Sequence, residues 1–435
     1  MWSPRRSRLP GQRKVTVTST CMPLLAWAMI FPVSAEEFTV NSYTTSDQVA
    51  PVVAADQSGT FLVVWQDSGG RDGSGSGIFG QRYDVDGAAT GDELQINSYT
   101  TSNQGQPRIA ARPGEFLVTW QGHGAGSSEG LFARRMDNSG QLGPEFLVSA
   151  EFDENHDVAL DDSGQAVLVW DIDTFNGGIR GQRFDSLNQP VGAQFQIDSP
   201  PNTPGYRHQY SNPRTASKPN GEFIVSWESY YEVPYGSFSS RQLRLRPHDA
   251  SGIPSNDFVV TNFTVTYDYF TIHGFDVTTD GEDFVVAWGD PADYGVQQIL
   301  SRRLGDSLSA AFEVGPAAPM TFPLDEDPAV DAAGPVTVTA WTSNRFTDDA
   351  DIGGREFRHG QEDSPATMQL NQETTGLQQS PSIAIDRESR RSLAVWQDPS
   401  RGDQDIVGRL LFGTLFADGF ESGDVLAWSS SSPPP

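Results

Sequence analysis

Tyrosines crowd into one stretch of the 435-residue chain. Eight of the eleven fall between residues 206 and 294: Tyr206, Tyr210, Tyr230, Tyr231, Tyr235, Tyr267, Tyr269 and Tyr294. Nearby polar residues are Arg207, His208, Glu228, Glu232, Asp268 and His273. Exposed rings beside polar groups suit stacking on sugar faces or capture of a protein partner, because rings supply contact area at small entropic cost. These residues predict a site for a glycan or an extracellular protein, unless long loops simply pack on themselves through tyrosine.

Acidic side chains in the same stretch offer a second chemistry. Glu228, Glu232 and Asp268 could supply the acid and the base or nucleophile of glycoside hydrolysis, which needs two carboxylates about 5 to 10 Å apart. The sequence does not fix that spacing, and it contains no metalloprotease helix, nucleophile elbow or phosphate loop. We therefore expect a non-enzymatic binding protein. A glycan-processing hydrolase or lyase and a purely structural extracellular protein are the alternatives.

Some acidic loops have the ligand type that a hard cation prefers. These are Asp84-Val-Asp-Gly87, the set Asp348, Asp349 and Asp351, and the set Asp398, Asp403 and Asp405. None matches an EF-hand loop, and an Asx-Gly turn accounts for the first. No cofactor is expected, with structural Ca²⁺ as the open alternative. Arg401-Gly-Asp403 spells an adhesion tripeptide, but three-residue matches are frequent by chance.

Charge and the N-terminal segment bound the location. The chain has 29 Lys and Arg against 57 Asp and Glu, a net charge of −28, which repels nucleic acid. Residues 1–35 combine a basic start, an apolar stretch from Met22 to Val33 and small residues up to Ala35, which predicts an export signal. The only cysteine, Cys21, lies inside it. Because no other segment has the roughly 20 apolar residues of a membrane span, we expect a secreted monomer, extracellular or periplasmic, with cell-surface association as a further option.

Seven tryptophans indicate the framework that must position these side chains. They are Trp65, Trp120, Trp170, Trp227, Trp288, Trp341 and Trp396, with gaps of 55, 50, 57, 61, 53 and 55 residues. Most of them end an apolar run without alternation, such as Phe61-Leu-Val-Val-Trp65, which predicts a strand covered on both faces. Each unit holds four short β-rich runs between turns. The sequence therefore predicts an all-β, seven-bladed β-propeller of four-stranded antiparallel blades over residues 36–413.

The two ends of the repeat predict how the ring closes. A strand of the type that begins at Phe38 follows each unit, but the one at Phe38 has no unit before it, and the last unit stops one strand short near Phe412. We expect the N-terminal strand to complete the last blade and remove both open sheet edges. Each unit also carries an arginine, and we expect these to pair with carboxylates of their own or the next blade. They are Arg82, Arg135, Arg183, Arg244, Arg303, Arg355 and Arg409.

Three short motifs connect the units to a known family. The opening Asn41-Ser-Tyr-Thr-Thr-Ser46, identical to residues 97–102, the Val-Val-Trp-Gln centre and the Gly80-Gln-Arg-Tyr-Asp84 close resemble the repeats of secreted bacterial β-propeller proteins. The resemblance implies a propeller outside the cytoplasm but no particular activity. The Asp-Gly-Phe-Glu-Ser-Gly-Asp segment at 418–424 is similar to a C-terminal motif of exported bacterial proteins, which implies a sorting or processing tag. Residues 414–435 are expected to be a partly disordered tail.

The loop lengths predict which face carries function. In a four-stranded meander, the loops that enter a blade share a face with the loops between its second and third strands. Both sets are long and variable here, whereas the other face has compact turns such as 56–59. We expect function on the irregular face and place the eight tyrosines there, in loops of units four and five.

Overall fold

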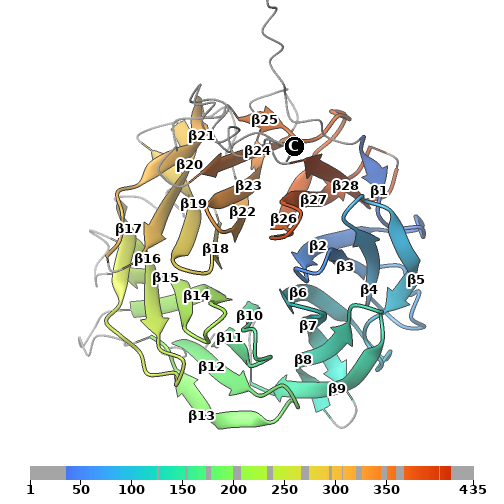
Figure 1. The fold of residues 1–435 in the computed structure, drawn as a ribbon, viewed down its shortest axis with the longest axis horizontal. Coiled ribbons are helices and arrows are strands. Elements are labelled where there is room, and N and C mark those ends of the chain that lie inside the picture. The colour runs from blue at the N-terminus through green and yellow to red at the C-terminus, as the bar shows by residue number, and fades with distance from the viewer. Residues whose placement is uncertain are drawn as a thin grey trace, which may run out of the picture.

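The computed structural model describes residues 36–412 except 125–126, 152–154, 173–177, 199–206, 233–238, 266–273, 293–295, 306, 320–325, 344–349, 359–366 and 401. Regular structure in these residues consists of β-strands, in seven four-stranded antiparallel sheets around a common centre (Figure 1). This arrangement confirms the predicted seven-bladed β-propeller. The predicted export signal and C-terminal tail lie outside the described residues. Within them, no helix has the length and apolar character that crossing a membrane would require.

In blades 1 to 6 the strands run in sequence order from the ring centre outward, and in blade 7 the first strand of the chain is outermost. Blades 1 to 4 are β2 (Gln48–Ala55), β3 (Thr60–Asp67), β4 (Gly77–Asp84) and β5 (Ala89–Gln95); β6 (Gln104–Arg112), β7 (Glu115–Gly124), β8 (Ser127–Asp137) and β9 (Leu142–Ser149); β10 (His156–Leu160), β11 (Ala166–Ile172), β12 (Gly178–Phe184) and β13 (Pro190–Gln196); β14 (Arg207–Ser217), β15 (Phe223–Glu232), β16 (Ser239–His248) and β17 (Phe258–Val265). Blades 5 to 7 are β18 (Phe275–Thr279), β19 (Phe284–Ala292), β20 (Val296–Leu304) and β21 (Phe312–Pro319); β22 (Glu326–Ala333), β23 (Val336–Ser343), β24 (Asp351–Arg358) and β25 (Met368–Gln369); β26 (Gln379–Ile385), β27 (Arg391–Asp398), β28 (Asp405–Phe412) and β1 (Phe38–Thr39).

The second strand of each blade is covered on both faces, as its unalternating apolar run predicts. All seven repeat tryptophans lie on these strands and are at most 3% exposed. One side of each blade packs on the preceding blade and the other on the following blade, so the core is a set of inter-blade layers. In three blades the indole is also hydrogen-bonded. Trp65 Nε1 donates to Gln48 Oε1 and Trp120 Nε1 to Gln104 Oε1, both at 3.1 Å, and Trp288 Nε1 donates to Asp290 Oδ2 at 3.2 Å.

The ring closes through the N-terminal strand. β1 pairs antiparallel with β28, with Phe38 opposite Gly408 and Thr39 opposite Val407 (Figure 1). The pairing continues past the strand, because Val40 N donates to Ile406 O at 2.7 Å. Gly408 makes room for the closing strand: a Cβ atom there would lie 3.1 Å from the Phe38 ring. The predicted completion of the last blade is therefore confirmed.

The Asn-Ser motif has a structural explanation. Asn41, Asn97 and Asn371 each accept a hydrogen bond, at 2.7 to 2.8 Å, from a main-chain N–H at the start of the third strand of their blade. The next residue reaches the following blade: Ser98 N donates to Glu145 Oε2 at 2.8 Å. An unpaired buried N–H is costly, so in these three blades one asparagine satisfies a strand end that the sheet leaves open, and Asp198 accepts from Ile179 N in the same way in blade 3.

The arginines do not form the single ring of carboxylate pairs that the sequence predicts. Strand pairing separates most of the third-strand arginines into two classes by the residue they face on the second strand, whereas Arg244 faces Trp227 itself. Those opposite the residue two before the tryptophan donate to buried main-chain carbonyls of the preceding blade: Arg134, Arg246, Arg302, Arg355 and Arg409. Of those opposite the residue three before it, Arg82, Arg135 and Arg183 reach a turn of the following blade, whereas Arg303 pairs with Asp280 of its own blade.

Carboxylates do bind some of the predicted arginines. Arg135 pairs with Glu115 at 3.0 Å and Arg244 with Asp257 at 3.2 Å, and Arg303 pairs with Asp280. Main-chain carbonyls are nevertheless the more regular partners. The reason is that carbonyl groups recur at every blade edge, whereas carboxylates at those places vary from unit to unit.

An engineered disulfide tests the closure. Val40 and Ile406 are joined by a main-chain hydrogen bond, so the neighbouring pair Thr39 and Val407 is of the non-hydrogen-bonded type, whose Cα atoms lie closer together. In a Cys21→Ser background, Thr39→Cys with Val407→Cys should form an intramolecular disulfide and raise the free energy of unfolding by up to about 4 kcal/mol. Non-reducing electrophoresis and urea unfolding with and without reductant would measure both effects.

The matched control is Thr39→Cys with Leu411→Cys, because residue 411 lies roughly 13 Å further along β28. Equal cross-linking of the two pairs would contradict the register.

Candidate functional site

The structure places the predicted tyrosines differently from the sequence analysis. Tyr210 lies on β14, and Tyr230 and Tyr231 lie on β15, so these three are in strands rather than loops. The remaining five lie outside the described residues: Tyr206, Tyr235, Tyr267, Tyr269 and Tyr294. The loop assignment failed because the strands of blade 4 continue beyond the length that the apolar pattern indicates. β14, β15 and β16 have 11, 10 and 10 residues, against 5, 7 and 7 for the same strands of blade 3.

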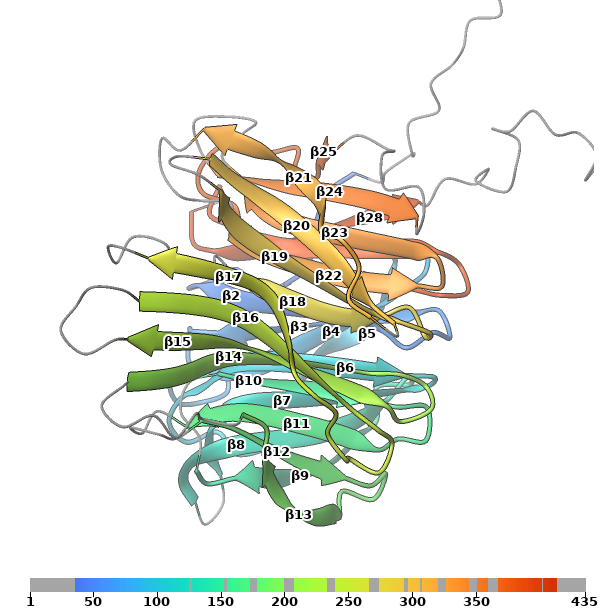
Figure 2. The ribbon, with the colours of Figure 1, turned by 90° about the vertical axis from the view of Figure 1, so that its left-hand side faces the viewer.

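Blade 4 projects from the ring on one side. We call this side the loop face, because it carries the loops into each blade and between the second and third strands; the opposite side is the turn face. Figure 2 shows the ends of β14 to β17 extending past the other blades. The extension is a continuous antiparallel sheet in which His208 pairs with Tyr231 and Tyr231 with Ser240. It gives these side chains a rigid support outside the core.

One surface of this extension is aromatic and uncharged. His208 and Tyr231 have ring centroids 5.0 Å apart, and Ser240 belongs to the same cross-strand row. Ser240 Oγ donates to Asn262 Oδ1 at 2.8 Å, and Gln242 pairs with Asn262 in a row two residues further along. We call these five residues the blade 4 aromatic face. Burial lowers the pKa of His208, so its imidazole is favoured in the neutral form.

Tyr210 belongs to the core rather than to a binding surface. Its side chain is 6% exposed and packs among residues of blades 3 and 4. Burial, followed by the negative charge of Asp198, raises the pKa of Tyr210 to about 12. Its place in the predicted ligand-binding set is therefore not supported by its position.

The opposite surface of the extension carries Tyr230, Arg241 and Glu228. The Arg241 guanidinium lies 5.1 Å from the centroid of the Tyr230 ring and 3.9 Å from Glu228 Oε2. Glu228 Oε1 also accepts from Asn212 Nδ2 at 3.2 Å, and the residue is 8% exposed. Asp268 and the side chain of Glu232 lie outside the described residues, so Glu228 is the one predicted catalytic carboxylate whose position is described.

The predicted calcium loops have other functions where they are described. Asp84 Oδ1 accepts from Asp86 N and Ala88 N, as in an Asx turn. Asp351 and Asp405 accept from Asn371 and Asn41, the strand-capping asparagines. In the described part of the chain, no three His, Cys, Asp or Glu side chains are grouped to hold a metal. Arg401 lies outside it, and Asp403 accepts from Ser46 N at 3.0 Å.

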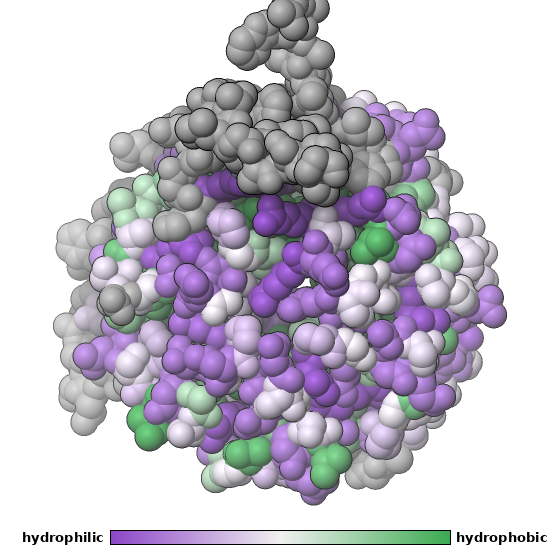
Figure 3. Space-filling model, viewed as in Figure 1, coloured by the Kyte–Doolittle hydropathy of each residue, from purple (hydrophilic) through white to green (hydrophobic). Residues whose placement is uncertain are grey.

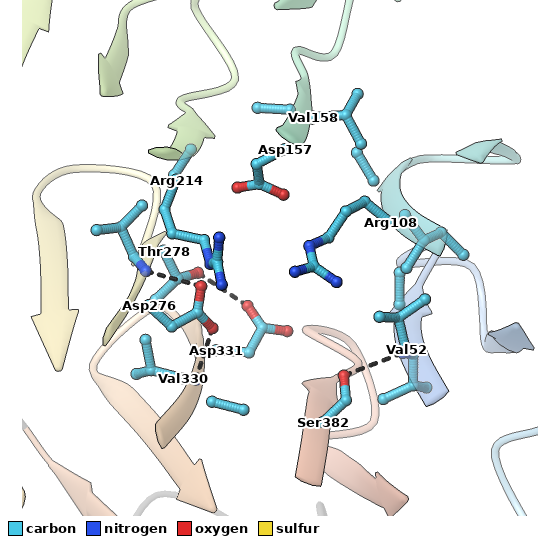
Figure 4. A pocket seen from close by; sticks show the side chains of 18 of the residues that line it. Val52, Arg108, Asp157, Val158, Arg214, Asp276, Thr278, Val330, Asp331 and Ser382 are labelled. Carbon is cyan, nitrogen blue, oxygen red and sulfur yellow. Dashed lines mark hydrogen bonds between the residues drawn. The ribbon is translucent and has the colours of Figure 1, made fainter. Parts of the chain in front are cut away.

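A cavity of about 690 Å³ occupies the centre of the ring, and the sequence analysis did not find it. The innermost strands of all seven blades line this channel, and Figure 3 shows it as a hollow bordered mainly by hydrophilic residues. Charged side chains of both signs point into the cavity. Arg108 and Arg214 lie beside Asp157, and Asp276 lies beside Asp331 (Figure 4). At the turn face, Arg387 Nη2 donates to Thr279 O at 3.4 Å, from blade 7 to blade 5. Arg387 thus reaches past blade 6 at that end of the channel.

The channel carboxylates join neighbouring blades. Thr215 N donates to Asp157 at 2.8 Å, Val330 N to Asp276 at 3.0 Å and Ile385 N to Asp331 at 2.9 Å, each from the following blade. The inner strand is an edge strand, so its outward N–H groups have no strand partner. Each aspartate therefore supplies an acceptor that the next blade needs.

Burial makes the negative charge of these aspartates energetically unfavourable. Burial raises the pKa of Asp157, Asp276 and Asp331, and for Asp276 the value is about 6. Hydrogen bonds from main-chain N–H groups act in the opposite direction on all three and only partly offset the burial.

The channel entrance also has a repeated backbone feature. The residue before the inner-strand proline has positive φ in four blades: Ala50, Gln106, Asn212 and Ser380. In three of these blades the main-chain N–H of this residue donates to the side chain that follows the tryptophan of the preceding blade. Ala50 N donates to Gln397, Gln106 N to Gln66 and Asn212 N to Asp171. The repetition marks an architectural bulge rather than local strain at one functional residue.

Fold and site define the class of protein: a closed seven-bladed β-propeller with a polar central channel and one projecting blade. Similar solved structures include a polysaccharide lyase, the PL25 ulvan lyase, at 12% identity and TM-score 0.53, covering 86% of this chain and 95% of that chain. The ulvan lyase bound to -[GlcA(1-4)Rha3S]- is 12% identical, with TM-score 0.52 and the same coverage. The polysaccharide lyase Uly1 is 10% identical, with TM-score 0.51, covering 86% and 91%. At such identities the likeness shows the fold alone. The sequence matches no protein-family model and no curated protein.

The raised pKa of Asp276 predicts a specific pH dependence. An ordinary aspartate has a pKa of 3.8 and folded Asp276 one of about 6, so the folded state binds the proton more tightly. The resulting stabilisation is complete below the unfolded pKa and is lost as the pH rises through 6. Asp276→Asn keeps an acceptor for Val330 N without the charge. The unfolding free energy of the variant minus that of the wild type should therefore be about 1 to 3 kcal/mol larger at pH 7.5 than at pH 4.

Urea unfolding at both pH values would measure this difference, with Asp92→Asn, an exposed carboxylate, as the control. A variant that follows the wild-type pH profile unchanged would show that Asp276 titrates normally.

Proposed function

We propose that the protein is a non-enzymatic, secreted carbohydrate-binding propeller that holds its glycan against the blade 4 aromatic face. The observation that carries this proposal is the side-by-side placement of His208 and Tyr231, 5.0 Å apart, on a sheet that projects from the loop face. Flat rings stack on the C–H faces of sugars, and the neighbouring hydroxyl and amide groups suit sugar hydroxyls.

The lack of charge on this face favours a glycan over a charged protein partner. The chain as a whole has a net charge of −28, yet this face carries no Asp, Glu, Lys or Arg among its five residues, and burial lowers the pKa of His208. Tyr206, Tyr235 and Tyr267 adjoin the strands of blade 4 in sequence and remain predicted contributors, as do Tyr269 and Tyr294. The predicted export signal supports a location where extracellular glycans are accessible.

A glycan array followed by calorimetry on the best binder tests the proposal. Tyr231→Ala and His208→Ala should each weaken binding about tenfold, because each removes one ring face from the contact. Tyr43→Ala is the matched control, since Tyr43 also lies on the loop face but in a different sector, where Arg71 is 5.1 Å from the centroid of its ring. Absence of binding to any glycan, or equal losses for all three variants, would contradict the proposal.

A glycan lyase is the second candidate, and the same pair of residues favours it. Elimination from a uronic-acid glycan needs a base for the proton beside the carboxylate and an acid for the leaving oxygen. A neutral histidine and a tyrosine phenol can take these parts. His208 is favoured in the neutral form and adjoins Tyr231, and the structurally similar proteins include polysaccharide lyases. Under this alternative the predicted carboxylates Glu228, Glu232 and Asp268 are not the acid and base.

Product formation separates the two functions. Incubation with uronate-containing polysaccharides should give no rise in the ultraviolet absorbance of an unsaturated uronate if the protein only binds. A rise that His208→Gln abolishes, while His123→Gln on blade 2 leaves it unchanged, would replace the binding proposal with the lyase.

A further inference from the structure

The charges in the channel follow a pattern that begins from strand register. In every blade one inner-strand residue pairs with the residue immediately before the repeat tryptophan. In blades 2 to 5 this residue is Arg108, Asp157, Arg214 and Asp276, so the sign of the charge alternates from blade to blade. Blades 1, 6 and 7 have Val52, Ala329 and Ser382 at this position. The charged half of the ring is therefore specific to four neighbouring blades.

The two aspartates of this half bind inner-strand N–H groups. Asp276 accepts from Val277 N of its own strand at 2.9 Å and from Val330 N of blade 6 at 3.0 Å. Asp157 likewise accepts from Val158 N of its own strand and from Thr215 N of blade 4. Two aspartates thus serve the inner strands of blades 3 to 6. Arg108 and Arg214 cannot take this part, because a guanidinium has no acceptor for an N–H group.

Both arginines are anchored by their own strands, and Arg214 retains donors. Arg108 Nη1 donates to Pro107 O at 3.1 Å, and Arg214 Nη1 donates to Pro213 O at 3.0 Å, so each guanidinium is held by its own strand. Arg214 also lies 5.8 Å from the centroid of the Phe275 ring. Among the described residues Arg214 forms no ion pair within 4.0 Å. A guanidinium has five N–H groups, so Arg214 presents spare donors to the cavity.

An acceptor pair lies beside these donors. Asp276 and Asp331 come from adjacent blades, and Thr278 Oγ1 donates to Asp331 Oδ1 at 2.9 Å (Figure 4). Main-chain N–H bonds fix both carboxylates, yet a carboxylate has about four lone-pair directions and neither residue uses all of them. Burial disfavours their negative charge, so a bound cationic group would be stabilised there.

We propose that the central channel binds a small zwitterion, a molecule in which a carboxylate lies a few bonds from a cationic nitrogen. Arg214 and Arg108 hold the carboxylate, and Asp276 and Asp331 face the nitrogen. The cavity of about 690 Å³ has the size of a small-molecule site. A purely anionic ligand would be repelled by Asp157, Asp276 and Asp331, and a purely cationic one by Arg108 and Arg214. This site is separate from the blade 4 aromatic face and does not depend on the proposed function.

Isothermal titration of the wild-type chain with matched ligands tests the proposal. Glycine betaine carries both charges, choline keeps only its trimethylammonium group, and 3,3-dimethylbutyrate keeps only its carboxylate with a neutral group of the same shape. β-Alanine offers the same two charges with a primary ammonium. At least one zwitterion should bind about tenfold more tightly than either single-charge ligand. Equal binding of choline or 3,3-dimethylbutyrate, binding of Ca²⁺ alone, or no binding of either zwitterion would overturn the proposal.

Two variants locate the bound molecule. Arg214→Gln and Asp276→Asn should each weaken the zwitterion about tenfold, and Asp276→Asn should leave 3,3-dimethylbutyrate unchanged or tighter because it removes a repelling charge. Arg180→Gln is the control, since Arg180 on β12 bonds Gln196 outside the channel. Thermal unfolding checks that each variant is folded. Because the ligand comparison uses the wild-type chain, it decides the proposal even if a variant is unstable, and unchanged affinity in both folded variants would overturn the site.

Discussion

Every blade of this ring has two edge strands, and the polar main-chain groups on those edges must find partners in the neighbouring blades. The structure meets this requirement with side chains that repeat in register. Aspartates and a serine take up inner-strand N–H groups, and arginines bond outer-strand carbonyls. The buried tryptophan layers hold blades together without specifying direction. The polar contacts add that specificity, because each joins a given blade to a particular side of its neighbour.

The same requirement explains why the channel is polar. An apolar channel would leave the edge N–H groups of the inner strands without acceptors, so carboxylates are placed there despite the cost of burying charge. Once Asp157 and Asp276 are present, one aspartate can serve two blades. This economy leaves positions in blades 2 and 4 that architecture does not constrain, and both hold arginine. The contacts of each blade thus distinguish channel residues that bind edge N–H groups from channel residues that can serve recognition.

Much of the fold could be predicted from spacing alone, because Trp65 and its six equivalents mark strands that only stacked blades can cover on both faces. Register within a strand could not, since neighbouring arginines such as Arg134 and Arg135 differ by one residue and reach opposite blades. The site was predicted in part. The tyrosine cluster indicated blade 4, but strands that extend beyond the apolar pattern made loops of what is sheet. The alternation of Arg108, Asp157, Arg214 and Asp276 was a signal in the aligned units, but its meaning depends on knowing that these side chains converge.

The joint between blades 7 and 1 uses the same contacts as the other joints. Gln397 holds the bulge at Ala50 as Gln66 holds the one at Gln106, and Ser382 accepts from Val53 N where Asp276 accepts from Val330 N. The break in the chain between blades 7 and 1 therefore does not change how these two blades pack against each other. A circular permutant that joins residue 412 to residue 36 and opens the chain at another interblade loop would retain the full set of joints, so the ring has no intrinsic first blade.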